Sequence, residues 1–369
     1  MSPSRAPKKT PRRKAPTGRA PSQDRRDQGI PSDLVLRGAH KYLERMSLKR
    51  GETLLIITEP PSDRRLADGL FEAACQMGAR PIVTMIPYRG EHNIDPPKTL
   101  AATMKAADAA ITLIPYASAD FYTRPFLEML QGGTRMLGLL SGTTEMLIRY
   151  IYEHDFTVTD RICEALESVM SRASEVHITC PRGTDLTATI GGRPVQLNPG
   201  KVSNPGDEGY LPPGVVGQAP LEESWNGRVI FDAFAYPVGL LREPIQVEIH
   251  AGRLQKISGG KQAGEWREWF KGRNDPNIYW VAHYGFGINP TFRKLTGLKS
   301  LDERMYGLFD VGFGTNDLPC FMGKVRANGH TDGLLTKASV FFDGNCVFRD
   351  GSFVLPEIAA VISPGAASR

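Results

Sequence analysis

The chain has 369 residues, of which 41% are hydrophobic and 23% are charged, as in ordinary soluble globular proteins. This length exceeds what one compact core usually holds and therefore predicts two domains. No apolar run reaches the roughly 20 residues that a membrane helix needs, and the five dispersed cysteines form no C-x-x-C pair. The sequence argues against a disulfide framework and a cysteine-based zinc site, and it favours a cytoplasmic location without membrane attachment.

The net charge of +5 is concentrated at the start of the chain. Residues 1–29 contain nine Lys or Arg and two Asp, whereas the remaining chain contains 36 basic and 38 acidic residues. The nearly neutral body has no basic stripe and is not expected to bind nucleic acid. The tail is expected to be disordered, because it cannot bury enough apolar surface to offset the entropy of ordering. It is either a loose attachment to an anionic partner or a solvated leader without a specific role.

The first half of the chain alternates between amphipathic helices and short apolar strands. The expected helices cover about 32–46, 62–77, 97–106, 119–131 and 159–172, and the expected strands cover 54–58, 81–86, 109–114 and 136–140. Unbroken apolar strands joined by crossover helices predict a parallel sheet that is buried on both faces. Residues 30–172 are therefore predicted to form a Rossmann-like α/β domain. It has no G-x-G-x-x-G or G-x-x-x-x-G-K-[ST] loop, so the pattern does not predict a nucleotide site.

The second half of the chain has alternating segments that are separated by Gly, Pro and Asn. The expected strands are 175–180, 185–190, 228–235, 245–250 and 253–257, and a hairpin is expected at 338–353 around Asp343-Gly344-Asn345. Residues 191–220 are dense in Gly and Pro and predict a long loop, of the kind that carries function or is disordered. Residues 173–369 are therefore predicted to form an α+β catalytic domain with largely antiparallel sheets.

Two of the seven histidines stand in settings that differ from the rest. An apolar strand at 278–282 delivers His283 to a glycine-rich turn, and glycines let the backbone pass close to a ligand or another strand. His330 and Asp332 lie two residues apart between glycines, and in an extended segment this spacing puts both side chains on one face. The other five histidines lie on helical segments, in a polar loop or within strands, where a histidine is usually structural.

His330 and Asp332 together with the distant His283 could form a facial triad of two histidines and one carboxylate. Such a set favours Fe(II) and leaves coordination positions open for O2 and a substrate. The spacing also fits a simpler arrangement, in which His330 and Asp332 hydrogen-bond within a turn and bind no metal. Spacing alone does not decide between the two.

The sequence also contains distinctive strings, most of them in its second half. They are His283-Tyr284-Gly285-Phe286-Gly287-Ile288-Asn289-Pro290, Gly329-His330-Thr331-Asp332, Gly183-Thr184-Asp185-Leu186, Gly191-Gly192-Arg193, Asn226-Gly227-Arg228-Val229-Ile230-Phe231-Asp232 and residues 307–316. Together they resemble 2,5-dihydroxypyridine 5,6-dioxygenases, which share a superfamily with the thermophilic-type (M29) metallo-aminopeptidases. The resemblance spans about residues 32–355. It implies that His283, His330 and Asp332 hold Fe(II), that a small aromatic substrate and O2 bind there, and that the chain is a homo-oligomer.

The two branches of this superfamily differ at the metal site. The peptidases carry a Glu ligand where this chain has His283, and a second Glu in a P-x-G-E-V segment that here reads Pro212-Pro213-Gly214-Val215-Val216. Two carboxylates that a dinuclear hydrolytic site needs are thus missing, whereas the His, His and Asp of the dioxygenases are kept. The resemblance therefore implies a mononuclear, extradiol-type dioxygenase that cleaves a hydroxylated aromatic or N-heteroaromatic ring. The alternatives are an M29-like metal-dependent hydrolase and a non-catalytic protein with a vestigial metal site.

The resemblance implies catalytic positions at which this chain departs from the family pattern. A Glu and a His of the family match Asn198 and Tyr210, and a Ser beside the metal matches Gly312 or Gly314. Asn198 and Tyr210 are therefore the expected catalytic residues, although Tyr210 could equally be a surface tyrosine.

Other residues are expected to support the site or to hold the ring. Asp310 either orients a ligand histidine or is a solvated turn residue. Tyr284 and Phe286 are expected to line the ring pocket, with core packing as the alternative. Arg293 and Arg326 are expected to pair with a carboxylate or phenolate of the substrate.

Overall fold

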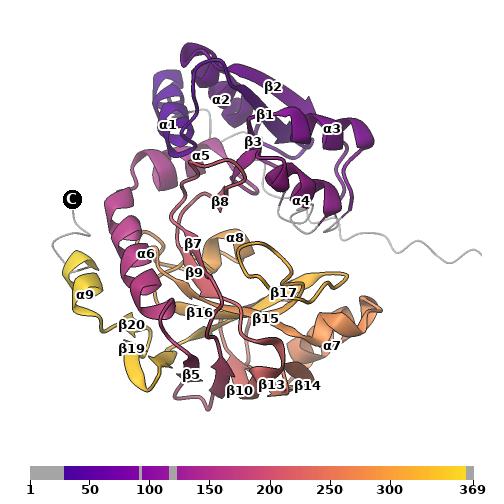
Figure 1. Cartoon of the computed structure of the whole chain (residues 1–369), viewed down its shortest axis with the longest axis vertical. Coiled ribbons are helices and arrows are strands. Elements are labelled where there is room, and N and C mark those ends of the chain that lie inside the picture. The colour runs from indigo at the N-terminus through magenta and orange to yellow at the C-terminus, as the bar shows by residue number, and fades with distance from the viewer. Residues whose placement is uncertain (1–28, 91–93, 116–122, 363–369) are drawn as a thin grey trace, which may run out of the picture.

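The computed structural model describes residues 29–90, 94–115 and 123–362, and it shows two domains stacked along the long axis of the molecule (Figure 1). The predicted disorder of the basic tail concerns residues that lie outside the described ones. Within the described ranges, no helix combines the length and apolar character that crossing a bilayer requires.

The N-terminal domain is built on a five-stranded sheet in the order β2-β1-β3-β4-β8, in which all neighbouring strands are parallel. Its strands are β1 (Thr53–Thr58), β2 (Arg80–Met85), β3 (Ala109–Thr112), β4 (Arg135–Gly138) and β8 (Glu208–Tyr210). The central strands β1, β3 and β4 are buried along nearly their whole length, as unbroken apolar runs in a parallel sheet should be. The predicted α/β fold of this domain is confirmed.

Helices cover both faces of this sheet. They are α1 (Ser32–Arg45), α2 (Arg64–Gln76), α3 (Lys98–Ala106) and α4 (Arg124–Gln131). Alternate residues of β1 point to opposite faces, so Leu54 and Ile56 share one core with α1 and α2, whereas Leu55 and Ile57 share another with α3 and α4.

Strand β8 lies in segment 191–220, which the sequence predicted as a long loop. It pairs with β4 although the chain has already contributed β7 (Val195–Asn198) to the C-terminal domain. The chain then returns to that domain in β9 (Val215–Gln218). The sheet of the N-terminal domain thus includes residues beyond the predicted boundary at 172, and β8 ties the two domains together.

The C-terminal domain contains two antiparallel sheets, which confirms the predicted fold class. The first has the order β14-β13-β10-β6-β5-β18-β19-β20 and the second the order β12-β11-β17-β16-β15-β9-β7. The remaining strands are β5 (Glu175–Thr179), β6 (Asp185–Thr189), β10 (Asn226–Phe231), β11 (Phe234–Ala235), β12 (Gly239–Leu240), β13 (Ile245–His250), β14 (Arg253–Ser258), β15 (Val281–Gly287), β16 (Leu308–Gly314), β17 (His330–Thr336), β18 (Ser339–Phe342), β19 (Asn345–Arg349) and β20 (Ser352–Phe353).

The predicted hairpin at 338–353 is present as β18 and β19. Its turn residues Asp343 and Gly344 both have positive φ, of 47° and 80°, as the two central residues of a type I′ turn require.

One apolar core joins the two antiparallel sheets. Val229 and Phe231 of β10 meet Tyr284 of β15 and Phe309 of β16 in it. The core is closed by α6 (Phe156–Met170), α7 (Lys261–Gly272) and α9 (Pro356–Ile362). Short helical turns complete the described chain at α5 (Thr144–Leu147), Ile148–Tyr152, Glu222–Ser224, Pro276–Tyr279 and α8 (Lys299–Asp302). The opposite face of the seven-stranded sheet is turned toward the N-terminal domain (Figure 1).

Candidate metal centre

Three adjacent strands of the seven-stranded sheet form the base of the site. Gly312 of β16 lies between His283 of β15 and Asp332 of β17, because the antiparallel registers pair it with both. A β-bulge between Val281 and His283 shifts the register just before the histidine and sets its direction. In β17 the two-residue spacing places His330 and Asp332 on the same face, as predicted from the sequence.

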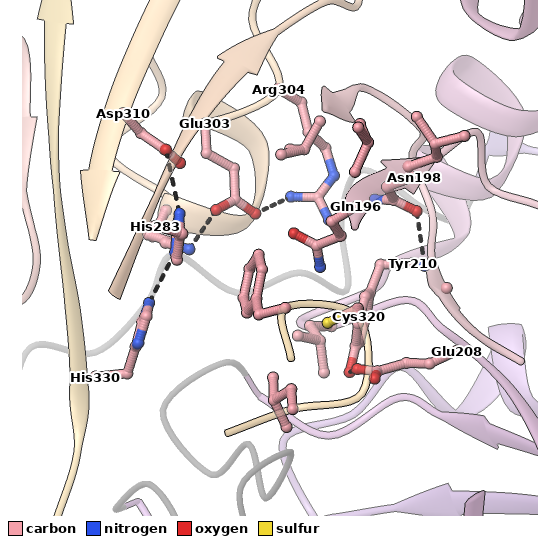
Figure 2. Close-up of a pocket in the computed structure, with 18 residues that line it drawn as sticks. Gln196, Asn198, Glu208, Tyr210, His283, Glu303, Arg304, Asp310, Cys320 and His330 are labelled. Carbon is pink, nitrogen blue, oxygen red and sulfur yellow. Dashed lines mark hydrogen bonds and ion pairs between the residues drawn. The ribbon is translucent and has the colours of Figure 1, made fainter. Parts of the chain in front are cut away.

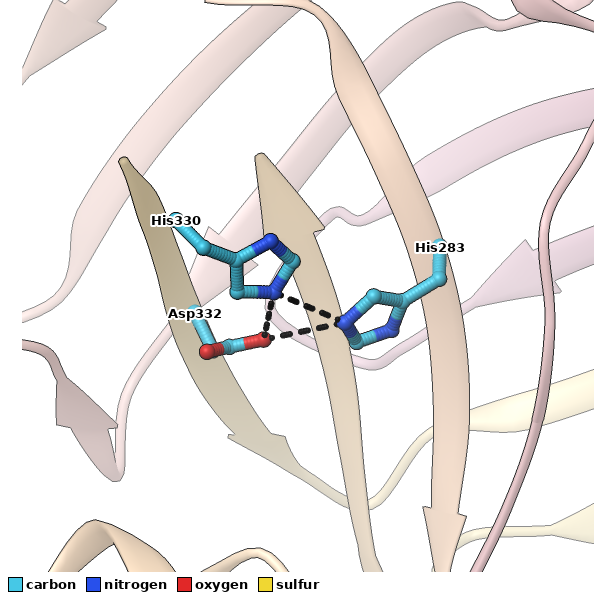
Figure 3. A group of neighbouring side chains, drawn as sticks. All are labelled: His283, His330 and Asp332. Atoms are coloured by element: carbon cyan, nitrogen blue, oxygen red, sulfur yellow. Dashed lines mark hydrogen bonds and ion pairs between the residues drawn. The ribbon is translucent and has the colours of Figure 1, made fainter. Parts of the chain in front are cut away.

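The three side chains converge at buried positions. His283 Nε2 lies 3.0 Å from His330 Nε2, and both nitrogens lie 3.2 Å from Asp332 Oδ1 (Figure 3). The exposed fractions are 8% for His283, 7% for His330 and 1% for Asp332. Among the described residues, this is the one group of three or more His, Cys, Asp or Glu side chains whose ligand atoms come this close together.

Because Gly312 has no side chain, the ligand atoms of His283 and Asp332 have room to approach each other beside it. A Cβ atom at this position would lie 2.5 Å from His283 Nε2 and 2.9 Å from Asp332 Oδ1. Both distances are shorter than real side-chain contacts, so any larger residue would push the ligand atoms apart. The arrangement of His283, His330 and Asp332 around Gly312, called the cradle below, therefore depends on a residue without a side chain.

The other nitrogen of each imidazole faces an oxygen. His330 Nδ1 lies 3.1 Å from the carbonyl oxygen of Thr315, and His283 Nδ1 lies 3.6 Å from Asp310 Oδ1. Oxygen partners of this kind fix the ring orientation and leave Nε2 free for a metal. Burial by itself would lower the pKa of His283, but the negative charges of Asp310 and Asp332 raise it to about 9. Two carboxylates thus favour a positive charge at this position.

A buried ion-pair chain covers the second oxygen of Asp332. Lys299 Nζ lies 3.1 Å from Asp332 Oδ2 and also pairs with Glu303, which in turn pairs with Arg304. Burial by itself would raise the pKa of Asp332, but the charges of Lys299 and His330 and the histidine hydrogen bonds hold it well below its usual value. Asp332 is therefore held as a carboxylate, with one oxygen toward the histidines and the other toward an ammonium group.

The donor set fits one divalent first-row ion. Atoms 3.0–3.2 Å apart can all reach an ion at about 2.1 Å, the usual distance to an imidazole nitrogen. Such atoms subtend roughly right angles at the ion, as a facial set does, whereas a tetrahedral site would hold them about 3.4 Å apart. A bound ion would replace the proton of His283 as the positive charge at this position, and two imidazoles and one carboxylate without a thiolate suit iron and its neighbours in the first row.

A cavity of about 200 Å³ opens beside these side chains and lies between the two domains (Figure 2). This is room for one single-ring molecule, since a cavity of about 150 Å³ binds benzene. The lining is formed by Leu140, Val195, Gln196, Leu197, Asn198, Glu208, Gly209, Tyr210, Val215, His283, Lys299, Glu303, Arg304, Asp310, Leu318, Cys320, Phe321 and His330. The Phe321 ring stacks on the His283 ring with centroids 5.0 Å apart and planes 12° apart, so the metal end of the cavity has an apolar wall.

Comparison with known proteins identifies the relatives of this chain. The family model for 2,5-dihydroxypyridine 5,6-dioxygenase matches residues 35–355. The chain belongs to this family. The 2,5-dihydroxypyridine 5,6-dioxygenase of Pseudomonas putida KT2440 is 25% identical over 331 residues, which cover 83% of this chain and 92% of the relative.

Two solved structures share the fold. The 2,5-dihydroxypyridine dioxygenase of P. putida KT2440 superposes with a TM-score of 0.79 at 22% identity, over 89% of this chain and 99% of the other. Wild-type AmpT from Thermus thermophilus superposes with a TM-score of 0.65 at 15% identity, over 88% of this chain and 100% of the other. The predicted resemblance to the dioxygenase family is confirmed, and the likeness to AmpT is one of fold.

Three of the other predicted site residues of this family member lie at the cavity. Asp310 faces His283, as described above. The Asn198 side chain accepts a hydrogen bond of 3.0 Å from the backbone N–H of Tyr210, and the Tyr210 hydroxyl donates one of 2.7 Å to Glu208. The structure brings these residues to the site, and their roles remain proposals.

Four predicted substrate contacts lie elsewhere, which corrects those predictions. Tyr284 and Phe286 are 0% exposed and pack in the core between the two antiparallel sheets, because neighbours of His283 along a strand must point to the opposite face. Arg293 is exposed and absent from the cavity lining. Arg326 is also absent from the lining and lies 2.7 Å from Asp317 in an ion pair.

Sequence reasoning missed the charged residues of the cavity. Lys299, Glu303 and Arg304 lie in the connection between β15 and β16, where the i,i+4 spacing of Lys299 and Glu303 was the available signal. Glu208 was missed because its three-residue strand lies in a Gly/Pro-rich segment. Its alternation with Tyr210 could have placed both side chains on one face.

Proposed function

We propose that the chain is a mononuclear non-heme Fe(II) dioxygenase that cleaves a hydroxylated aromatic or N-heteroaromatic ring with O2, in an extradiol-type reaction. The observation that carries this proposal is the buried cluster of two imidazole nitrogens and one carboxylate oxygen within 3.0–3.2 Å of one another. Family membership supports the choice of reaction, since the family is that of 2,5-dihydroxypyridine 5,6-dioxygenase. His283, His330 and Asp332 would hold the metal.

When bound, Fe(II) would offer open positions on which O2 and a ring oxygen can lie side by side. The protein contributes the geometry around that chemistry. Asp310 and the carbonyl of Thr315 keep the two imidazoles turned toward the ion, and Lys299 keeps the second oxygen of Asp332 occupied. Asp332 is thereby favoured as a ligand through one oxygen.

The cavity walls would hold the substrate ring and limit the access of water. Leu140, Leu318 and Phe321 supply apolar surface that suits a flat ring, beside the polar side chains of Gln196, Glu303 and Arg304. Tyr210 is a proposed substrate contact, and Asn198 would position it through the hydrogen bond to its backbone. Ring and O2 would then be held together in a small space, and this positioning is the main contribution of the protein to the chemistry of the metal.

The alternative hydrolase has weaker support. A dinuclear hydrolase needs carboxylates for a second ion, and the Lys299 ammonium lies beside the second oxygen of Asp332. The similarity to AmpT concerns the fold, which does not fix the reaction. A homo-oligomeric state and a cytoplasmic location remain predictions.

Anaerobic reconstitution with Fe(II), followed by O2-uptake measurements with dihydroxypyridines and aminophenols, tests the proposal. We expect one iron per chain and O2 consumption coupled to loss of the aromatic absorbance. His330→Ala should abolish both. The matched control is His250→Ala, which changes an exposed histidine outside the cavity lining and should leave both unchanged. Peptide hydrolysis without O2 uptake, or a failure to bind iron, would refute the proposal.

A further inference from the structure

A second polar group stands at the end of the cavity away from the histidines. Glu208 and Tyr210 alternate along β8, both line the cavity, and the Tyr210 hydroxyl donates a hydrogen bond of 2.7 Å to Glu208 Oε1. Figure 2 shows this pair across the cavity from His283 and His330. The N-terminal domain therefore supplies a polar cavity wall that faces the metal centre of the C-terminal domain.

The scaffold fixes the position of this pair. β8 is in register with β4, where Gly138 lies opposite Tyr210. A Cβ atom at Gly138 would lie 2.7 Å from the Tyr210 ring, so the missing side chain makes room for that ring. The hydrogen bond from the Tyr210 N–H to Asn198 Oδ1 ties β8 to β7 of the other sheet. The two side chains are thus held by both domains.

The cavity between its two ends has a mixed lining, in which Gln196, Glu303 and Arg304 lie beside apolar side chains (Figure 2). Leu140, Leu318 and Phe321 line it, and the Phe321 ring is nearly parallel to that of His283. A single ring that fills this space would place one edge at the metal ligands and the opposite edge at Glu208 and Tyr210. A polar group on that opposite edge would meet hydrogen-bonding partners, whereas an unsubstituted edge would leave the Glu208 carboxyl with no partner besides the Tyr210 hydroxyl.

The Glu208 carboxyl suits a substrate group that is either a hydrogen-bond donor or an acceptor. Lys299 and Arg304, which also line the cavity, both pair with Glu303. Cys320 lines the cavity near Glu208, and burial together with the Glu208 charge raises the pKa of its thiol. Burial raises the pKa of Glu208 to about 7 against the smaller opposing effect of the Tyr210 hydrogen bond. At neutral pH the carboxyl can therefore donate a hydrogen bond as the acid or accept one as the carboxylate.

We propose that Glu208 and Tyr210 form a specificity site, which recognises a hydroxyl, carbonyl or N–H group on the ring edge opposite the metal-bound oxygen. This inference rests on the proposed function, because it assumes that the ring reaches the metal at its other edge. It assigns substrate choice to a pair from the N-terminal domain and the metal to the C-terminal domain.

Ligand pairs that differ at one ring edge test this assignment. The full chain, loaded with Zn(II) as a redox-inert ion, is titrated calorimetrically with 2,5-dihydroxypyridine and with 3-hydroxypyridine, which lacks the second oxygen substituent. We expect the wild type to bind 2,5-dihydroxypyridine at least about tenfold more tightly, the effect of one good hydrogen bond. Glu208→Ala should weaken the binding of 2,5-dihydroxypyridine and leave the affinity for 3-hydroxypyridine unchanged, so that the two affinities become equal. Glu223→Ala, at an exposed position outside the cavity lining, is the matched control and should keep the wild-type ratio.

The pH dependence of the affinity ratio separates recognition from a structural role. It should differ between the wild type and Glu208→Gln, because the amide keeps hydrogen bonding but does not titrate. In the wild type the hydrogen bond from Tyr210 lowers the pKa of Glu208. Tyr210→Phe removes this bond, so the pKa of Glu208 should rise and the pH dependence of the affinity ratio should shift to higher pH. This variant tests the proposal even if Glu208→Ala does not fold.

An equal loss of both affinities in Glu208→Ala, or no loss, would overturn the proposal. So would identical pH dependence in the wild type, Glu208→Gln and Tyr210→Phe. The ratio of the two affinities is measured without O2 and without turnover. A chain with the Glu208-dependent ratio but without iron-dependent O2 uptake would refute the proposed function alone.

Discussion

Replacing Gly312 by alanine should damage the metal site while leaving the fold in place. The added Cβ would lie 2.5 Å from His283 Nε2, whereas ordinary contacts between non-bonded heavy atoms are about 3.5 Å or longer. The ring must therefore move by about 1 Å. It has little freedom to do so, because it is stacked between Phe321 and His330 with centroids 5.0 Å away on each side.

Displacements of this size at a functional centre cost about a hundredfold, and weakened support of a metal ligand costs about 10–100-fold in affinity. We expect Gly312→Ala to bind Fe(II) or Zn(II) about a hundredfold more weakly, which corresponds to roughly 2.7 kcal/mol. Overpacking should also lower the free energy of unfolding by about 1–3 kcal/mol.

Competition with a fluorescent chelator measures the metal affinity, and urea denaturation of the metal-free protein measures the stability. Gly272→Ala is the matched control, because a Cβ at that position meets nothing within 4 Å. An affinity of Gly312→Ala within threefold of the wild type, in a folded protein, would refute the assignment of the metal to this cradle.

Three further changes test the surroundings of the centre and one remote group. Asp310→Asn should weaken metal binding by about 10–100-fold in the same competition assay, because His283 loses the charge that orients it. Lys299→Met should lower the free energy of unfolding of the metal-free protein by about 3 kcal/mol, since it leaves the buried Oδ2 atom of Asp332 without its ammonium partner. Lys256→Met, in an exposed ion pair, should change this free energy by less than about 1 kcal/mol. Burial and the charge of Lys41 lower the pKa of His154 from 6.5 to about 4, so the stabilising effect of its neutral form is complete above pH 6.5 and is lost as the pH falls to 4. The unfolding free energy of the wild type should therefore fall by about 3 kcal/mol more than that of His154→Gln across this range, and parallel pH profiles would contradict this assignment.

Local patterns accounted for the fold class and for two of the three side chains of the candidate metal centre. Apolar runs between amphipathic helices indicated the parallel sheet, and an alternating second half indicated the antiparallel sheets. The two-residue spacing of His330 and Asp332 fixed their shared face, because side chains alternate along a strand. The same rule contradicts the pocket role predicted for Tyr284 and Phe286, since residues next to and three from His283 point to the opposite face.

Short strands and long-range charge contacts were not predictable in the same way. β8 has three residues within a Gly/Pro-rich segment, too few to show a period, and its partner β4 lies some 70 residues earlier in the chain. Lys299 resembles any helical lysine in sequence, and only the folded connection between β15 and β16 brings it to Asp332. The role of such residues depends on distance in space, which sequence spacing does not encode.

The sequence by itself determined which side chains could bind a metal and that two of them share one strand face. The tertiary structure decided that His283 joins them, because the antiparallel register of β15, β16 and β17 aligns it with Asp332 across Gly312. It also decided that the cavity has a second polar end, because β8 carries Glu208 and Tyr210 into the N-terminal sheet and turns them toward the centre. Local periodicity follows from backbone geometry within a few residues, whereas register and sheet membership follow from the packing of the whole chain.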